Sequence, residues 1–140
     1  MRNHSHTPGL VYQKVSKAIT LGTGAVPVTE NLFTVTGEVE AQVYGFVDTS
    51  ITAAGAVTLE LGVTGNTASL IAITLKAELV LNEFWTAVTQ VTGAIAPPAA
   101  KLISAANILH VIRDSAATAG AITYYCLWRP ISVDGNVVAA

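Results

Sequence analysis

The chain has 140 residues, a formal net charge of −2 and only 11% charged residues. This length is typical of one domain that buries roughly two thirds of the surface its unfolded chain exposes. Ordinary soluble domains carry about 25% charged residues, so this chain is unusually poor in charge. Its seven Lys and Arg residues are scattered and form no basic patch. We therefore expect no nucleic-acid partner.

Membrane insertion and secretion are not expected either. The best apolar run, residues 102–112, is about half of the roughly 20 residues that a spanning helix needs. The first ten residues contain no apolar segment of the kind found in a secretory signal. Cys126 is the only cysteine, which rules out an internal disulfide and fits a reducing cytoplasm. We expect part of the weakly charged surface to be buried against another protein.

The start of the chain predicts an arm followed by a strand. Residues 1–9 are rich in polar types and end in Pro8-Gly9. They predict a flexible arm ahead of a single domain formed by residues 10–140. Residues 10–21 are weakly strand-like, and two glycines and a proline then end that pattern.

Residues 32–48 have the clearest periodicity in the chain. Apolar residues occupy one parity, and Thr, Glu and Gln occupy the other. This alternation places one set in a core and the other in water. Gly37 and Gly45 share the apolar parity, so each marks a bulge, a bend or a close backbone approach. The pattern fits one long bent strand or two consecutive strands, with Glu38 and Glu40 facing solvent.

The next segments predict a hairpin. Residues 56–63 alternate, with four aliphatic residues pointing inward and Thr58 and Glu60 pointing outward. Residues 64–67 favour a turn, and the apolar segment that follows returns as the second strand. Residues 75–83 fit a short helix or another strand equally well, because periodicity cannot separate the two at this length.

The C-terminal part predicts three strands and one long loop. Residues 84–91 are a strand candidate because of their aromatic and β-branched content. Pro97-Pro98 prevents regular pairing, which makes residues 93–106 a loop. Residues 107–114 and 122–133 are the last two predicted strands.

A short repeat occurs at two places in the chain. Residues 54–58 and 119–123 share the pattern Ala-Gly-Ala-(Val/Ile)-Thr, and each follows a strand, an Asp and a small-residue loop. Two similar hairpins would explain the repeat, as would chance in an alanine-rich chain. A total of about eight strands with little helix predicts an all-β, single-domain β-sandwich, with a jelly roll or a small barrel as variants.

Few residues could carry catalysis or hold a metal ion. His4 and His6 form an H-x-H pair on the predicted arm, but they lack further ligands and a shaped cavity. His110, Asp114 and Ser115 are the residue types of a hydrolase triad, yet they lie within six positions on one strand and its loop. A triad needs a base oriented between nucleophile and acid. We expect His110 to be a buried or half-buried strand histidine, and we expect no metal and no cofactor.

The remaining reactive groups do not favour an enzyme. Cys126 has no His beside it and lies in an aromatic strand, which is typical of a buried, inert thiol. Glu38 and Glu40 share a predicted solvent face, whereas glycoside hydrolysis needs two acids facing each other across a cleft. Residues 22–27, GTGAVP, lack the Lys of a phosphate-binding loop. We expect a protein without catalytic activity.

The segment AITYYCLWRPISVDGNV, residues 121–137, holds two Tyr, the only Cys and a Trp. Alternation gives its strand two faces, Ile122, Tyr124, Cys126 and Trp128 on one and Thr123, Tyr125, Leu127 and Arg129 on the other. Large residues on both faces indicate a strand that is buried on both sides. The core covers one face. A neighbouring subunit or a loop of the same chain would cover the other face. Tyr, Trp and Arg, which are enriched at interface hot spots, favour the subunit.

The apolar C-terminus is a second part of the predicted interface. Residues 134–140 predict a turn followed by an apolar tail of the kind that docks on a partner. The candidate interface residues are Tyr125, Leu127, Arg129, Val137 and Val138.

Three segments of the chain resemble small virion proteins of tailed bacteriophages. They are TLELGVTGNTASLIA at 58–72, KLISAANILHVI at 101–112 after a Pro/Ala/Gly-rich stretch, and ITYYCLWRPISVDGNVV at 122–138. The resemblance covers residues 30–140 and is greatest to the capsid decoration, or cement, class. It implies a β-rich protein, often trimeric, that sits outside an icosahedral shell and helps it to resist the pressure of packaged DNA.

The resemblance also implies a location and partners. It places the protein on the capsid surface of a virion assembled in the host cytoplasm, with the major capsid protein as partner and self-association as a homotrimer. It implies no catalytic residue and no cofactor. Other virion positions stay open, namely the tail, the neck and the base of a head fibre. The low charge and the Thr/Ala/Val-rich composition suit a subunit of a repeated assembly, in which weak contacts add through avidity.

Two functions from other classes compete with this one. A carbohydrate-binding β-sandwich would use Trp85 and Trp128 as stacking platforms for sugar rings. Trp85, in the sequence NEFWTAV, suits this role better, because Trp128 lies on the predicted core face. A hydrolase built on His110 is the third candidate and is disfavoured by the crowding of its triad residue types.

Overall fold

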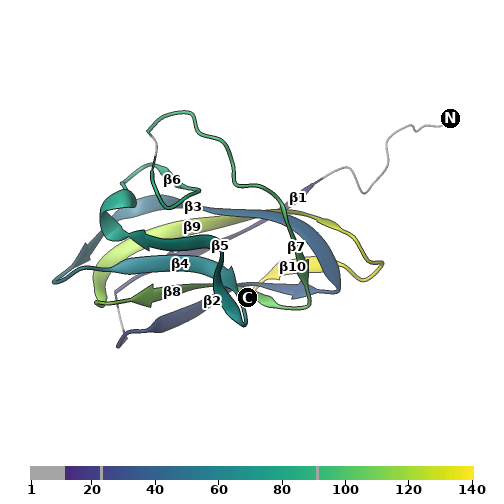
Figure 1. Ribbon diagram of the computed structural model, residues 1–140, viewed down its shortest axis with the longest axis horizontal. Coiled ribbons are helices and arrows are strands. Elements are labelled where there is room, and N and C mark those ends of the chain that lie inside the picture. Colours follow the sequence, from purple (N-terminus) through teal and green to yellow (C-terminus); the bar gives the residue numbers. More distant parts are fainter. Residues whose placement is uncertain (1–11, 23, 91) are drawn as a thin grey trace.

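A computed structural model describes residues 12–22, 24–90 and 92–140, and the described part contains ten β-strands (Figure 1). The strands form two antiparallel five-stranded sheets whose inner faces share one hydrophobic core. The predicted all-β sandwich is therefore confirmed. The predicted arm, residues 1–9 with His4 and His6, lies outside the described residues. No helix in the described ranges is long and apolar enough to cross a membrane.

Each sheet combines strands from distant parts of the chain. The strands are β1 (Gln13–Thr20), β2 (Val28–Thr36), β3 (Glu38–Ala53), β4 (Thr58–Val63), β5 (Asn66–Leu75), β6 (Phe84–Trp85), β7 (Lys101–Ser104), β8 (Asn107–Arg113), β9 (Ala117–Pro130) and β10 (Asn136–Ala139). In the first sheet, sheet A, the order is β1-β9-β3, and β7 and β6 both pair with the far edge of β3. In sheet B the order is β10-β2-β8-β4-β5.

The segment 32–48 forms two consecutive strands that lie in different sheets. β2 belongs to sheet B and β3 to sheet A, and Gly37, with a φ of +63°, makes the corner between them. The positive φ favours glycine at this corner, and a Cβ there would also lie 2.5 Å from the Asp134 Oδ1 atom, so that side chain would have to move. The two halves share one apolar parity because they line the same core from opposite sides.

Sheet A fills the core mainly from β3 and β9. Gly45 of β3 makes room for this packing, since a Cβ there would lie 2.9 Å from Ile122 Cγ2 and 3.3 Å from the Tyr124 ring. The largest fully buried side chains come from both sheets and include Trp85, Tyr124, Phe33, Leu32, Leu59, Leu61, Ile108 and Ile122. The core therefore spans the full space between the sheets.

Thr58 and Glu60 of β4 are buried, although alternation predicts that they face water. They are 6% and 4% exposed. Glu60 forms an ion pair with Arg113 of the neighbouring strand β8. The first residues of β5 also lie close over β4, because a Cβ at Gly62 would be only 2.3 Å from the Asn66 carbonyl oxygen. The start of β5 therefore covers part of this side of β4. Sequence periodicity does not show this kind of cover.

Residues 75–106 differ from the sequence prediction, with less strand at 84–91 and more at 93–106. The expected strand at 84–91 reduces to the two residues of β6, and Gln90 folds back so that its Nε2 donates to the Phe84 carbonyl at 2.5 Å. Within 75–83, only Lys76–Glu78 form a helical turn, of the 3₁₀ type. The expected loop at 93–106 contains β7, which pairs with β3 once the chain has passed the two prolines.

The two copies of the short repeat are not equivalent hairpins. Residues 54–58 lead out of β3 into β4, whereas residues 119–123 lie inside β9. The second copy sits beside a register shift, between the pairs Thr49–Ala121 and Thr52–Ala119. The repeat therefore has no counterpart in the symmetry of the fold.

Candidate interaction surface

The outer face of sheet A carries the predicted interface residues of β9. Tyr125, Leu127 and Arg129 point away from the core and are half-buried, as the alternation predicts. We term this surface the A face. Cross-strand pairing places on it the residues Lys14, Glu40, Gln42, Tyr44, Phe46, Phe84, Leu102, Tyr125, Leu127 and Arg129.

Aromatic rings gather on one part of the A face. The ring centroid of Tyr44 lies 5.8 Å from that of Phe84 and 5.7 Å from that of Tyr125, and Phe46 lies 5.0 Å from Phe84. Rings at these separations attract one another when they are tilted or edge to face. The Lys14 ammonium lies 5.9 Å from the centroid of Tyr125, a cation–π contact. Burial, and to a lesser extent the Tyr125 hydroxyl, raises the pKa of Tyr44.

A cavity of about 270 Å³ opens beside this cluster. Its lining consists of Tyr44, Phe84, Thr86, Ile95, Pro97 and Leu127. The segment between β6 and β7 lies on the A face here, because Gln42 Nε2 donates to the Pro98 carbonyl at 3.0 Å. A loop of the same chain and Leu127 thus line the same cavity, and such a loop is one of the two alternatives that the sequence leaves open for covering this face. Phe84 is 40% exposed, so the cavity rim remains open to solvent.

An ion pair occupies the middle of the A face. Arg129 Nη2 and Nε donate to Glu40 Oε1 at 2.5 and 2.8 Å. The Tyr12 hydroxyl donates to the other carboxylate oxygen at 3.0 Å. The hydrogen bonds from Arg129 first, and from Tyr12 second, hold the pKa of Glu40 below its ordinary value. The charges of Arg129 and Glu40 are therefore neutralised within the chain.

Apolar side chains project into solvent near the opposite end of the A face. Leu102 is 78% exposed and Ile131 is 50% exposed, and both line a cavity of about 260 Å³ beside Glu38. Val133, in the turn between β9 and β10, is fully exposed at 108%. Leu102, Ile131 and Val133 are thus among the exposed large apolar side chains of the described residues.

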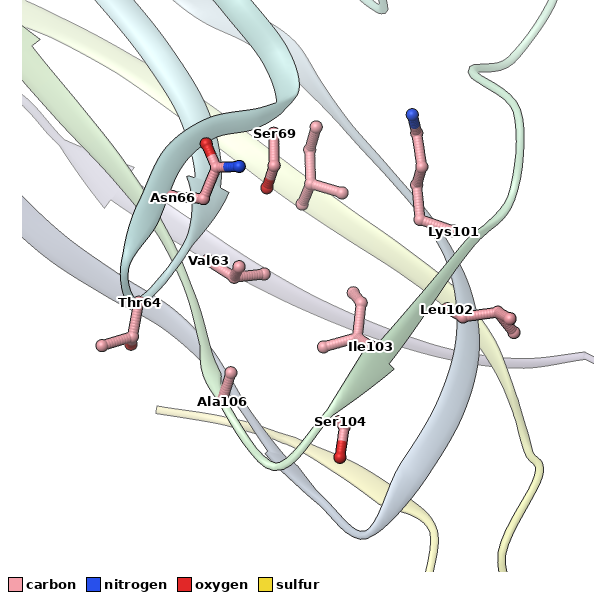
Figure 2. A pocket seen from close by; sticks show the side chains of 10 residues that line it. Val63, Thr64, Asn66, Ser69, Lys101, Leu102, Ile103, Ser104 and Ala106 are labelled. Atoms are coloured by element: carbon pink, nitrogen blue, oxygen red, sulfur yellow. The ribbon is translucent and has the colours of Figure 1, made fainter.

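A separate cavity of about 300 Å³ lies at the open edge between the sheets. Figure 2 shows its lining, with Val63, Asn66 and Ser69 of the β4–β5 hairpin on one side and Lys101 and Ile103 of β7 on the other. The lining mixes aliphatic and small polar side chains, and Lys101 is the charged group among them. This cavity marks where two sheet edges approach without pairing.

The two C-terminal interface candidates have different surroundings. Val138 is 48% exposed and remains available to a partner. Val137 is 4% exposed and belongs to the hydrophobic core, so its assignment to an interface is corrected. The reason is the alternation along β10, which turns Val137 inward as it pairs with Val35 of β2.

The hydrolase residue types are not brought together. His110 is 1% exposed, as expected of a strand histidine, and its Nδ1 lies 2.6 Å from the Tyr124 hydroxyl. Burial lowers the pKa of His110 to about 4. The Asp114 carboxylate accepts a hydrogen bond from the Thr58 hydroxyl at 2.8 Å instead of orienting the histidine. His110 therefore acts as a core residue whose partner lies in the opposite sheet.

A line of polar contacts that crosses the core has no signature in the sequence. Trp85 Nε1 donates to Thr74 Oγ1 at 3.1 Å, and the Trp85 ring packs edge to face on Tyr124 at 6.2 Å. Trp85 is 0% exposed, so its suggested role as a sugar-stacking platform is wrong. Trp128 is 5% exposed, as predicted. The strand pattern placed His110 and Tyr124 inward, but the partners lie in different sheets and have no shared sequence signal.

Cys126 is buried, as expected of an inert thiol. Burial raises the pKa of its thiol to about 12. Among the residues that the structure describes, no group of three or more His, Cys, Asp or Glu side chains is placed to hold a metal ion. The strongest candidate for function in the described part of the molecule is thus the A face.

Comparison with known proteins identifies no relative of this chain. No protein-family model matches this chain, and neither a curated protein nor a solved structure is similar enough to match it.

Proposed function

We propose that this protein is a non-enzymatic virion structural protein that binds the outside of a phage capsid as a homotrimer and stabilises the shell. The resemblance to phage decoration proteins suggests the class. The observation that carries the proposal is the A face, which presents half-exposed aromatic and aliphatic side chains, two cavities and a neutralised ion pair. Tyr and Arg at the centre of such a face match the residues enriched at interface hot spots.

The proposed mechanism is binding, with no chemical step. Apolar side chains such as Leu102 and Ile131 would leave water on docking, which contributes about 25 cal/mol per Å² of apolar area. A trimer engages several capsid subunits at once, so all contacts must break before it dissociates. A ligand that binds the assembled shell but not the disrupted shell shifts the equilibrium between these two states toward the assembled shell. This linkage is the physical basis of cementing.

The test uses shells of the phage that encodes the chain. Light scattering after size exclusion should give a native mass of three times the 14.5 kDa chain mass. The protein should co-sediment with expanded shells until their sites are saturated, and it should raise the temperature at which the shells break. Protein that stays in the supernatant and leaves this temperature unchanged would overturn the capsid proposal. Binding to purified tails instead would assign it to another virion position.

Two matched variants show whether the A face carries the binding. Ile131→Glu places a charge at the end of the A face, beside Leu102, and we expect it to weaken shell binding at least tenfold. Ile73→Glu is the control, because Ile73 is similarly exposed, at 53% against 50%, and lies on the edge strand of sheet B. Equal loss of shell binding in both variants would show that the A face has no special role.

A further inference from the structure

Val133 is a fully exposed apolar side chain on a well-braced turn. The turn is anchored to the corner before β3, since the Ile131 N–H donates to the Glu38 carbonyl at 2.8 Å and the Glu38 N–H donates to the Ser132 hydroxyl at 2.8 Å. It is closed by the Gly135 N–H, which donates to the Ser132 carbonyl at 3.0 Å. A side chain held in this way loses little conformational freedom when it docks.

The aromatic cavity of the A face is the concave surface that suits such a side chain. Its volume of about 270 Å³ accommodates a branched aliphatic side chain together with part of its turn. Tyr44, Phe84 and Leu127 line it with apolar groups. An inserted aliphatic side chain would shield the exposed part of the Phe84 ring.

The turn that carries Val133 and the aromatic cavity lie beside charges of opposite sign. Asp134 follows Val133 in the turn and is exposed, and Glu38 stands at the base of the same corner. Lys14 lies next to the cavity, because it pairs with Leu127 across β1 and β9. Lys14 is exposed and forms no ion pair with any residue in the described ranges. The acidic turn of one copy is attracted to the Lys14 ammonium beside the cavity of another copy, whereas two acidic turns repel each other.

From these observations we propose that Val133 of one copy inserts into the A-face cavity of the next copy of this chain. The turn contacts Glu38, and the cavity lies by Tyr44, which is about 20 Å further along β3 at roughly 3.3 Å per residue. Figure 1 shows the turn between β9 and β10 at one end of the molecule and β6 toward the other. The contact is heterologous, because the turn of one copy meets the cavity of the next copy.

A repeated heterologous contact gives a closed ring or an open filament. A ring that closes after three copies is the homotrimer proposed above, so the inference rests on that proposal and names its contact. It also explains why one chain carries both an exposed apolar projection and an open apolar cavity.

Cysteine cross-linking tests the contact directly. Val133→Cys and Ile95→Cys are placed in separate, differently tagged chains that are co-expressed and mildly oxidised. The native Cys126 is buried and does not compete. The expected product is a disulfide-linked pair with one chain of each kind, at least tenfold more abundant than the product of either variant alone. The control pairs Val133→Cys with Ile73→Cys on sheet B, and we expect no cross-link. Equal cross-linking to the control position, or of Val133→Cys with itself, overturns the proposal.

A native-mass measurement gives an independent result. Val133→Asp should convert the trimer into a monomer with an unchanged circular dichroism spectrum, because Val133 is fully exposed within the chain. Ile73→Asp should remain trimeric. A Val133→Asp protein that stays trimeric overturns this contact and leaves the proposed homotrimer standing. A monomeric wild-type protein overturns both the contact and the homotrimer, and shell binding then tests the capsid proposal separately.

Discussion

The two faces of β9 are built from alternate residues of one strand but differ in what covers them. The inner face is sealed, with side chains at most 5% exposed, namely Ile122, Tyr124, Cys126 and Trp128. The outer face is covered only in part, by a lysine over Tyr125, by a loop beside Leu127 and by the carboxylate of Glu40 at Arg129. Stability should therefore depend on the inner face, and binding on the outer face, at positions one residue apart.

The largest difference between the faces should appear at Trp128. We expect Trp128→Ala to reduce the free energy of unfolding by ~3–5 kcal/mol, because the substitution leaves a large cavity among packed side chains. Urea denaturation followed by circular dichroism measures this loss. A loss below ~1 kcal/mol would mean that Trp128 lies outside the core and that the two faces are assigned the wrong way round.

The second expected effect is a pH dependence that originates at His110. Burial lowers its pKa in the folded state to about 4, whereas an unfolded histidine titrates near 6.5. Between these values the unfolded chain binds the proton more readily, so the free energy of unfolding falls as the pH decreases from about 6.5 to about 4. Above pH 6.5 this group has no effect. The total loss is about 3 kcal/mol, and urea denaturation at about pH 7 and pH 4.5 measures most of it.

A double variant provides the control for this pH dependence. His110→Leu combined with Tyr124→Phe removes both partners of the buried hydrogen bond and leaves no unpaired polar group behind. We expect the double variant to lose much less stability between about pH 6.5 and pH 4.5 than the wild type. An equal loss in both proteins would mean that carboxylates elsewhere, not His110, determine the pH dependence.

Leu127 lies on the outer face, one residue from Trp128 on the inner face. Leu127→Ala should cost about 1 kcal/mol of unfolding free energy, because the side chain is only half-buried under the loop. The same urea experiment measures it beside Trp128→Ala. If the two losses were equal, the outer face would be as much a part of the core as the inner face.

The smallest effect on stability is expected at Arg129, whose ion pair with Glu40 is open to solvent. Arg129→Ala should leave the denaturation midpoint near that of the wild type, because exposed ion pairs contribute little. It should raise the pKa of Glu40, since Arg129 supplies the largest of the effects that lower it. Carboxyl-detected NMR titration measures this rise. Tyr12→Phe is the control and should produce a smaller rise, because Tyr12 contributes the second effect. An unchanged Glu40 pKa in Arg129→Ala would show that the pair does not form in solution.

Alternation alone was enough to predict the two faces of β9. Tyr124, Cys126 and Trp128 point inward and Tyr125, Leu127 and Arg129 point outward, as the sequence indicates. His110 was expected to be a buried or half-buried strand residue, and the hairpin between β4 and β5 was expected from two strand-like segments around a turn. These features follow from the chain itself, because successive side chains of any strand point to opposite sides and glycine-rich segments turn.

Only the tertiary structure decided what covers each face. Trp85 looks like an exposed aromatic residue in its local sequence, yet β6 pairs with Gly45 of β3 and places the ring in the core beside Tyr124. Glu60 has the parity of a solvent residue and is buried with Arg113, and Val137 of the predicted interface packs inside the sandwich. Side-chain direction is a local property of the backbone, whereas burial depends on segments that are distant in the chain and approach only when the two sheets close.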